Sequence, residues 1–160
     1  MTRIQAIVLL VVTLAAAAAA RAQGKPDFSG TWKMDATRSA SAVQNEPIGP
    51  VTVVIMQSPT EFTITTMHGQ QTVTNTIKLD GTESKVAGGT AKARWDNATL
   101  IVESIRDIQG ASVTTKESRS LDPGGNEMHV DSVLEVQHGY TLRGTQNYGA
   151  GTDVYVRVRP

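Results

Sequence analysis

The stretch Phe28-Ser29-Gly30-Thr31-Trp32-Lys33-Met34-Asp35 decides the fold of this chain. It places a large aromatic residue at the head of a series of short segments in which apolar and polar residues alternate. Alternation with a period of two is typical of β-strands that bury one face. No segment after residue 22 has the 3.6-residue apolar period of a helix. The stretch therefore predicts the first strand of an all-β domain.

The rest of the chain divides into alternating runs separated by turn residues, for example at Asp80-Gly81, Asp96-Asn97 and Asp122-Pro123-Gly124-Gly125. The runs are 51–56, 62–66, 73–79, 92–95, 100–102, 113–121, 128–136, 140–146 and 154–158. With the first strand they make about ten strands, near the spacing that is typical of sandwiches and barrels. The one long connection, Ala36–Pro50, has room for at most a turn or two of helix.

Short turns make consecutive strands neighbours, so the strands should form an antiparallel up-and-down meander. A meander of about 8–10 strands avoids exposed edges best by closing into a barrel. A barrel of that size can enclose one small ligand. The sequence therefore predicts a single all-β barrel domain over residues 23–160.

Residues 1–22 have the three parts of a secretory signal peptide. Arg3 supplies a positive start, 7–20 is apolar or small apart from Thr13, and Ala20-Arg21-Ala22 offers small residues for cleavage. The chain contains no cysteine, hence no disulfide. An exported domain without disulfides suits a bacterial periplasm or secretome. We expect cleavage after Ala22 and a periplasmic or secreted bacterial protein.

The net charge of residues 23–160 limits the kinds of partner that the domain can bind. Arg3 and Arg21 lie in the signal segment, so residues 23–160 carry 13 basic and 15 acidic side chains. A domain with this slight negative excess has no electrostatic case for binding nucleic acid or an anionic membrane surface. We expect no membrane span after signal cleavage, and a monomer.

Motifs for metal, cofactor or catalytic chemistry do not emerge. The histidines, His68, His129 and His138, show no metal-ligand spacing, and two of them precede a glycine in turn-like contexts. The sequence has no nucleophile elbow, Walker loop or dinucleotide fingerprint. We expect no cofactor, no metal and no catalytic residue.

Gly30-Thr31-Trp32-Lys33 after Phe28, at the start of an antiparallel meander, resembles the opening of the calycins, the lipocalins and fatty-acid-binding proteins. The chain is most similar in pattern to small exported bacterial lipocalin-like proteins. Arg119-Ser120-Leu121 resembles the strand of fatty-acid-binding proteins that bears an internal arginine. Val154-Tyr155-Val156-Arg157 resembles their last strand, in which a tyrosine of an Arg-x-Tyr pair holds the ligand carboxylate. Here Asp153 stands where that pair would place arginine, and a carboxylate there repels a fatty-acid head group.

The resemblance implies a non-catalytic carrier whose barrel holds a small, largely apolar or amphipathic molecule. It implies five ligand-binding candidates, Arg119, Glu117, Tyr155, Arg157 and Trp32. Two other functions stay open. One is an isomerase- or cyclase-type enzyme on the same scaffold that uses Glu117 with Arg119 or Tyr155. The other is a protein-interaction module with a filled barrel.

Several side chains have two interpretations. Trp32 plugs one end of the barrel or contacts the ligand, and in the lipocalin pattern Arg157 or Arg159 stacks on it. Arg119 points inward if Leu121 does, and must then be paired, by Glu117 or a ligand anion, because an isolated buried charge is costly. Otherwise Arg119 belongs to an outward-facing strip of solvated charges.

The face of the last strand is also open. Tyr155, Arg157 and Asp153 share one face, whereas Val154, Val156 and Val158 share the other. Ordinary burial of valine puts the second set inside, and the family resemblance puts the first set inside.

Overall fold

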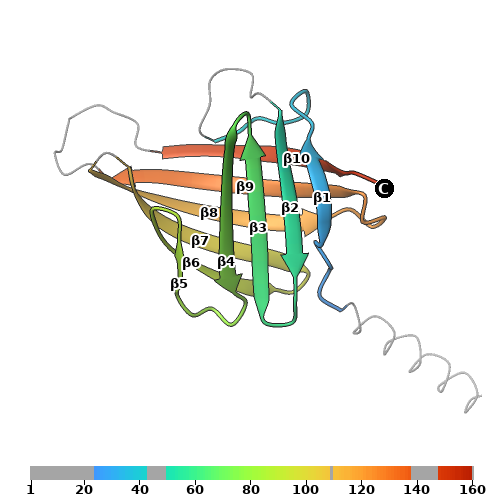
Figure 1. The fold of residues 1–160 in the computed structure, drawn as a ribbon, viewed down its shortest axis with the longest axis horizontal. Coiled ribbons are helices and arrows are strands. Elements are labelled where there is room, and N and C mark those ends of the chain that lie inside the picture. Colours follow the sequence, from blue (N-terminus) through green and yellow to red (C-terminus); the bar gives the residue numbers. More distant parts are fainter. Residues whose placement is uncertain (1–23, 43–49, 109, 138–147, 160) are drawn as a thin grey trace, which may run out of the picture.

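The computed structural model describes residues 24–42, 50–108, 110–137 and 148–159. They form one sheet of ten strands (Figure 1). The strands are β1 (Gly30–Met34), β2 (Val51–Gln57), β3 (Glu61–His68), β4 (Gln71–Lys78), β5 (Ser84–Val86), β6 (Gly89–Asp96), β7 (Thr99–Ile108), β8 (Ala111–Leu121), β9 (Glu127–Gln137) and β10 (Tyr148–Arg157). Within these ranges no segment is helical, and so none is a helix long and apolar enough to cross a membrane.

The sheet curls into a barrel because the first and last strands pair with each other. β1 is antiparallel to β10, with Trp32 opposite Arg157 and Met34 opposite Tyr155. The spatial order is β4-β3-β2-β1-β10-β9-β8-β7-β6-β5, and every neighbouring pair is antiparallel. The predicted all-β, up-and-down barrel is therefore confirmed.

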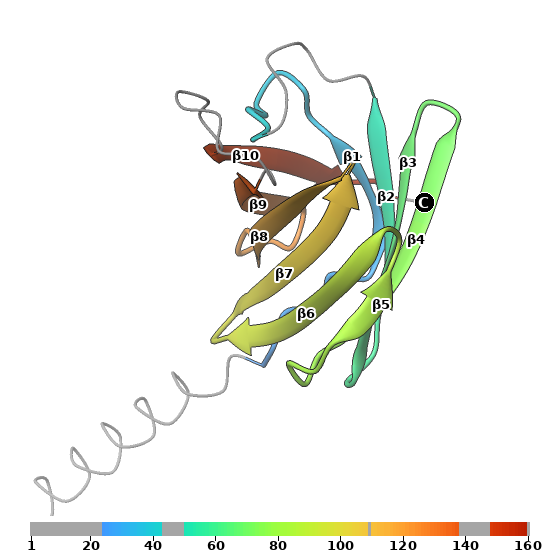
Figure 2. The ribbon, with the colours of Figure 1, turned by 90° about the vertical axis from the view of Figure 1, so that its left-hand side faces the viewer.

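The barrel has one seam, between β4 and β5, which lie side by side without a backbone ladder (Figures 1 and 2). Side chains replace the ladder there. The Lys78 N–H donates to Ser84 Oγ over 3.0 Å, and the Ala87 N–H donates to Asn75 Oδ1 over 2.9 Å. These bonds hold the two edges of the sheet together and leave the barrel nearly closed.

Alternate residues of each strand point into the barrel, as the period of two requires. In β2, Val51, Val53 and Ile55 are buried, whereas Met56 is exposed. The largest fully buried side chains are Trp32, Phe28, Phe62, Ile55, Leu100 and Met128. Most of them lie toward the end of the barrel where Phe28 and Trp32 enter, so this end is closed by packed aromatic and aliphatic groups.

Two features of the strand pattern differ from the sequence prediction. β5 is a three-residue strand that no alternating run predicted. β10 begins at Tyr148, well before the predicted start at Val154, because two glycines interrupt the alternation. A Cβ at Gly151 would collide with the backbone of residues 40–42, so the chain after β1 crosses β10 on the face to which a Gly151 side chain would point. The predicted strand 140–146 and the signal segment lie outside the described residues.

Replacing Trp32 by alanine tests the closed end. Trp32 has no exposed surface, and truncating a large buried side chain costs about 3–5 kcal/mol of unfolding free energy. We expect a loss of that size in chemical denaturation. Tyr148→Ala is the control, because Tyr148 is 62% exposed and should cost under about 0.5 kcal/mol. A loss below about 1 kcal/mol for Trp32→Ala would show that the ring is not a core plug.

Candidate functional site

Trp32 and Arg157 form a clamp at the closed end of the barrel. The Arg157 guanidinium lies 4.1 Å from the centre of the Trp32 ring. It donates to the carbonyl oxygens of Gly125 and Ser29, over 2.7 and 2.5 Å. The Trp32 Nε1–H donates to the Phe28 carbonyl over 2.8 Å. The stacking and the hydrogen bonds together hold the Arg157 side chain in one position. Arg157, and not Arg159, is thus the arginine that stacks on Trp32, as the lipocalin pattern led us to expect.

Gly30 is required by this clamp. Its φ of 134° lies in a region that residues with a side chain rarely adopt. A Cβ at that position would also lie 2.7 Å from Nη1 of Arg157. The glycine of the Gly-x-Trp motif thus makes room for the arginine that covers the tryptophan.

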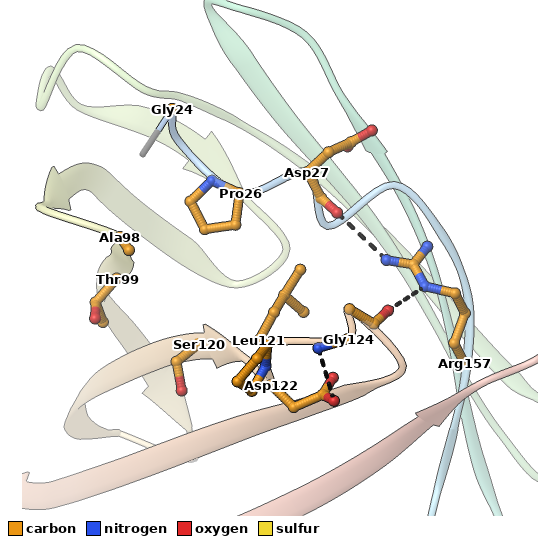
Figure 3. Close-up of a pocket in the computed structure, with 12 residues that line it drawn as sticks. Gly24, Pro26, Asp27, Ala98, Thr99, Ser120, Leu121, Asp122, Gly124 and Arg157 are labelled. Atoms are coloured by element: carbon orange, nitrogen blue, oxygen red, sulfur yellow. Dashed lines mark hydrogen bonds between the residues drawn. The ribbon is translucent and has the colours of Figure 1, made fainter. Parts of the chain in front are cut away.

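A hollow of about 560 Å³ lies outside the closed end, against the first described residues (Figure 3). Its charged groups are already engaged. Arg157 donates to the Asp27 carbonyl, and the Asp122 carboxylate accepts the backbone N–H groups of Gly124 and Asn126. The hollow is also broadly open to solvent. This hollow therefore lacks the enclosed shape and the free polar groups of a small-molecule site.

The barrel interior contains a smaller cavity of about 100 Å³. Half of the residues that line it are apolar and half are polar. They are Phe62, Ile64, Ile77, Val86, Ala91 and Val102, and Thr66, Asn75, Ser104, Arg106, Glu117 and Arg119. An apolar wall with a few polar groups is the usual composition of a small-molecule site.

Arg119 is the most deeply buried charged residue of the described chain, with 7% of its surface exposed. It lies on β8 opposite Leu100 of β7 and Val130 of β9. Its Nη2 donates to Glu117 Oε2 over 2.5 Å, and the guanidinium faces the Phe62 ring at 6.0 Å. Its Nε is buried and has no hydrogen-bond partner in the described part of the chain. Arg119 thus points inward, one of the two placements that the sequence left open, and keeps one buried donor without a partner among the described residues.

The last strand turns its polar face inward. Tyr155 is 8% exposed and belongs to the core that contains Trp32 and Met128, whereas Val156 and Val158 are exposed. The placement suggested by the family resemblance is therefore the observed one, and the ordinary burial rule for valine fails here. Val154 is buried as well, outside this core.

Asp153 lies on the inward face of β10, opposite Val130, which in turn lies opposite Arg119. The Ser41 hydroxyl donates to Asp153 Oδ1. Burial raises the pKa of the Asp153 carboxyl, and the Glu117 carboxylate raises it further. The Ser41 hydrogen bond and the Arg119 charge lower this pKa without reversing the shift.

The Tyr155 hydroxyl is held in its neutral form. Burial is the main cause that raises the pKa of Tyr155 to about 12, with Asp153 and Glu117 adding to the rise and Arg119 opposing it. The group is therefore protonated at neutral pH and can donate a hydrogen bond.

The structure brings three of the five predicted site residues together. Glu117, Arg119 and Tyr155 form an interior cluster with Asp153, which the sequence marked only as a departure from the family pattern. Trp32 and Arg157 lie in the clamp at the closed end. Asn75, Ser104 and Arg106 line the cavity but were not predicted. The parity of Ser104 and Arg106 with Leu100 was the signal that could have identified these two.

Solved structures share this architecture. Fluorescent protein UnaG (wild type) has a TM-score of 0.54 at 16% identity over 82% of this chain and 97% of its own. Fatty-acid-binding protein 1 of Echinococcus granulosus has a TM-score of 0.55 at 16% identity over 82% of this chain and 98% of its own. A mutant of the fatty acid transporter REP1-NXSQ has a TM-score of 0.56 at 17% identity, with 82% and 98% covered.

The fold is that of the calycins. The resemblance seen in the Gly-x-Trp opening is thus confirmed at the level of the fold. No protein-family model matches the chain, and no curated protein matches its sequence. At identities of 16–17%, these similarities establish the calycin fold of the chain and say nothing about its ligand.

The pH dependence of folding should report the half-buried Asp153. Its folded-state pKa lies above the ordinary value of 3.8, so between these two values the folded protein binds more protons than the unfolded chain. The free energy of unfolding therefore loses an Asp153 contribution as pH rises through that window. Asp153→Asn removes this loss. We expect the stability difference, variant minus wild type, to grow as pH rises above about 3.8 and then to level off.

Denaturant titrations at a series of pH values measure this difference. Asp131→Asn removes a carboxylate from the exposed face of neighbouring β9 and corrects for the change in net charge. A difference for Asp153→Asn that shrinks with rising pH would contradict the assigned burial of this carboxyl.

Proposed function

We propose that the protein is a carrier that binds a small amphipathic molecule inside the barrel, with its polar end at Arg119. The observation that carries this proposal is the Arg119 side chain, which is buried beside a cavity while its Nε has no partner among the described residues. Leaving a buried donor unsatisfied is costly, about 1–3 kcal/mol. A ligand oxygen that accepts from Nε removes this cost.

The size of the cavity limits the ligand. Its volume of about 100 Å³ lies well below that of ordinary drug-sized sites, roughly 300–1,000 Å³. A whole long-chain fatty acid does not fit such a space unless lining side chains move. A molecule of a few non-hydrogen atoms does fit, with its apolar part against Phe62, Ile64 and Ile77.

Two of the similar structures are a fatty-acid-binding protein and a fatty acid transporter, and they support interior binding of a small molecule by analogy alone. The half-polar lining of this cavity and the carboxylate at position 153 argue for a different ligand. We therefore propose that this protein shares the interior binding site of these proteins and binds a ligand other than a fatty acid.

We also propose export to the periplasm or the medium, as a monomer, after removal of residues 1–22. The positive start, the apolar run and the Ala20-Arg21-Ala22 site support it. N-terminal sequencing of the protein isolated from its source should begin at Gln23 or within a few residues. A product that retains Met1–Ala22 in the membrane fraction would contradict export with cleavage.

Native mass spectrometry of the protein isolated from its source tests the carrier function. We expect a co-purifying small molecule, and a lower occupancy in Arg119→Met. Loss of a charge-assisted hydrogen bond, about 1.5–3 kcal/mol, weakens binding roughly ten- to a hundredfold.

Glu117→Gln separates an anchor from a structural bridge. If Arg119→Met and Glu117→Gln lower the melting temperature alike and leave the occupancy unchanged, Arg119 only stabilises the barrel and the proposed function is wrong. If Arg119→Met folds and loses the bound molecule, Arg119 is the anchor.

A further inference from the structure

The interior cluster carries more negative than positive charge. Glu117 and Asp153 are carboxylates, and Arg119 is the buried cation, on the same strand as Glu117 and in line with Asp153 across Val130 of β9. The Arg119 charge is already engaged by Glu117 at 2.5 Å. Asp153 receives only a hydroxyl hydrogen bond, from Ser41. One carboxylate of the cluster is therefore without a counter-ion among the described residues.

Two carboxylate oxygens of the cluster have no partner among the described residues, one on Glu117, which lines the cavity, and one on Asp153, which lies beside the cavity lining. Oε1 of Glu117 and Oδ2 of Asp153 accept no hydrogen bond from any residue that the structure describes, because the bonds of these groups run through Oε2 and Oδ1. The raised pKa of Asp153 agrees with the charge count, since burial and the Glu117 charge outweigh the pull of Arg119.

The other groups that face the cluster do not restore the balance. Tyr155 is neutral and can only donate or accept a hydrogen bond. Arg106 lines the cavity, but its side chain is exposed, so water screens its charge. Thr66, Asn75 and Ser104 are uncharged.

We propose that the cavity binds a small organic cation, a protonated amine that also carries a neutral oxygen acceptor, and not a carboxylate. The inference rests on the proposed function and names its ligand class. The ammonium group donates to the free oxygen of Glu117 and is attracted by the nearby Asp153 carboxylate, and the oxygen accepts from Arg119 Nε. An amino alcohol has both groups within a few bonds.

Electrostatics separate this ligand from an anion. An ammonium group brings three donors and one positive charge, so it satisfies the spare acceptors and neutralises the cluster. A carboxylate would place a third negative charge beside the half-buried carboxylates of Glu117 and Asp153, which repel it. Hydrogen bonds that join charged partners are about twice as strong as neutral ones.

Isothermal titration calorimetry of the mature protein at neutral pH, with four probes of matched length, tests the proposal. The probes are 4-amino-1-butanol, n-butylammonium chloride, sodium butyrate and 1-butanol. We expect 4-amino-1-butanol to bind most tightly, and n-butylammonium to bind at least about tenfold more tightly than butyrate.

The isosteric variant Asp153→Asn is the matched test of the charge, since the amide retains an acceptor for Ser41. We expect it to weaken both amines about tenfold and to strengthen butyrate. Asp131→Asn, on the exposed face of β9, is the control and should leave all four affinities within about twofold.

The outcomes distinguish the two proposals. Butyrate binding more tightly than n-butylammonium, or 1-butanol binding as tightly as 4-amino-1-butanol, overturns the cation assignment and leaves interior binding standing, provided that Arg119→Met weakens it. The cation assignment is likewise wrong if Asp153→Asn leaves the amines unchanged. If no probe binds and native mass spectrometry finds no co-purifying molecule, the carrier function fails as well.

Discussion

The pairing of β1 with β10 is the interaction on which the rest of the structure depends. A ten-stranded meander has two open edges, and joining its first and last strands moves them to the β4–β5 seam, where side chains bridge them. Trp32 and Arg157 lie opposite each other in this pairing. The register of β1 with β10 therefore also places the Arg157 guanidinium over the Trp32 ring that closes the barrel. The chain uses no disulfide for this purpose, since it has no cysteine.

That register also determines the chemistry of the interior. With Arg157 opposite Trp32 and pointing inward, the period of two places Tyr155 and Asp153 inward as well. β9 then carries Met128 and Val130 between these residues and β8, which aligns Asp153 with Arg119. The charged cluster is thus a consequence of barrel closure, and its cost in desolvation is offset in part by the Glu117–Arg119 pair. Arg119 Nε remains without a partner among the described residues, which is unusual for a buried donor and is the observation from which the proposed ligand is argued.

The sequence predicts some parts of the fold and of the interior site and not others. The barrel and the burial of Trp32 follow from alternation, turn spacing and the Gly-x-Trp opening, whereas the inward placement of Arg119 was one of two that the sequence left open. The inward face of β10 does not follow from the sequence, because valines and polar residues alternate along this strand and either set could point inward. Only the pairing with β1 selects between the two sets. The start of β10 was missed because Gly149 and Gly151 are there to admit the backbone of residues 40–42, a tertiary contact that no local pattern contains. The volume of the cavity depends on side chains from several strands and could not be predicted from any single run.

The side-chain N–H resonance of Arg119 offers the most direct test of the central claim, that a ligand satisfies the buried Nε donor of this arginine beside the cavity. Arg119→Met identifies the Nε–Hε signal in a ¹H–¹⁵N spectrum. The account predicts a signal that exchanges slowly with water, as burial requires, and that shifts on addition of 4-amino-1-butanol while the Nε–Hε signal of Arg157 stays in place. A signal that exchanges rapidly with water and does not respond to any of the four probes would contradict it.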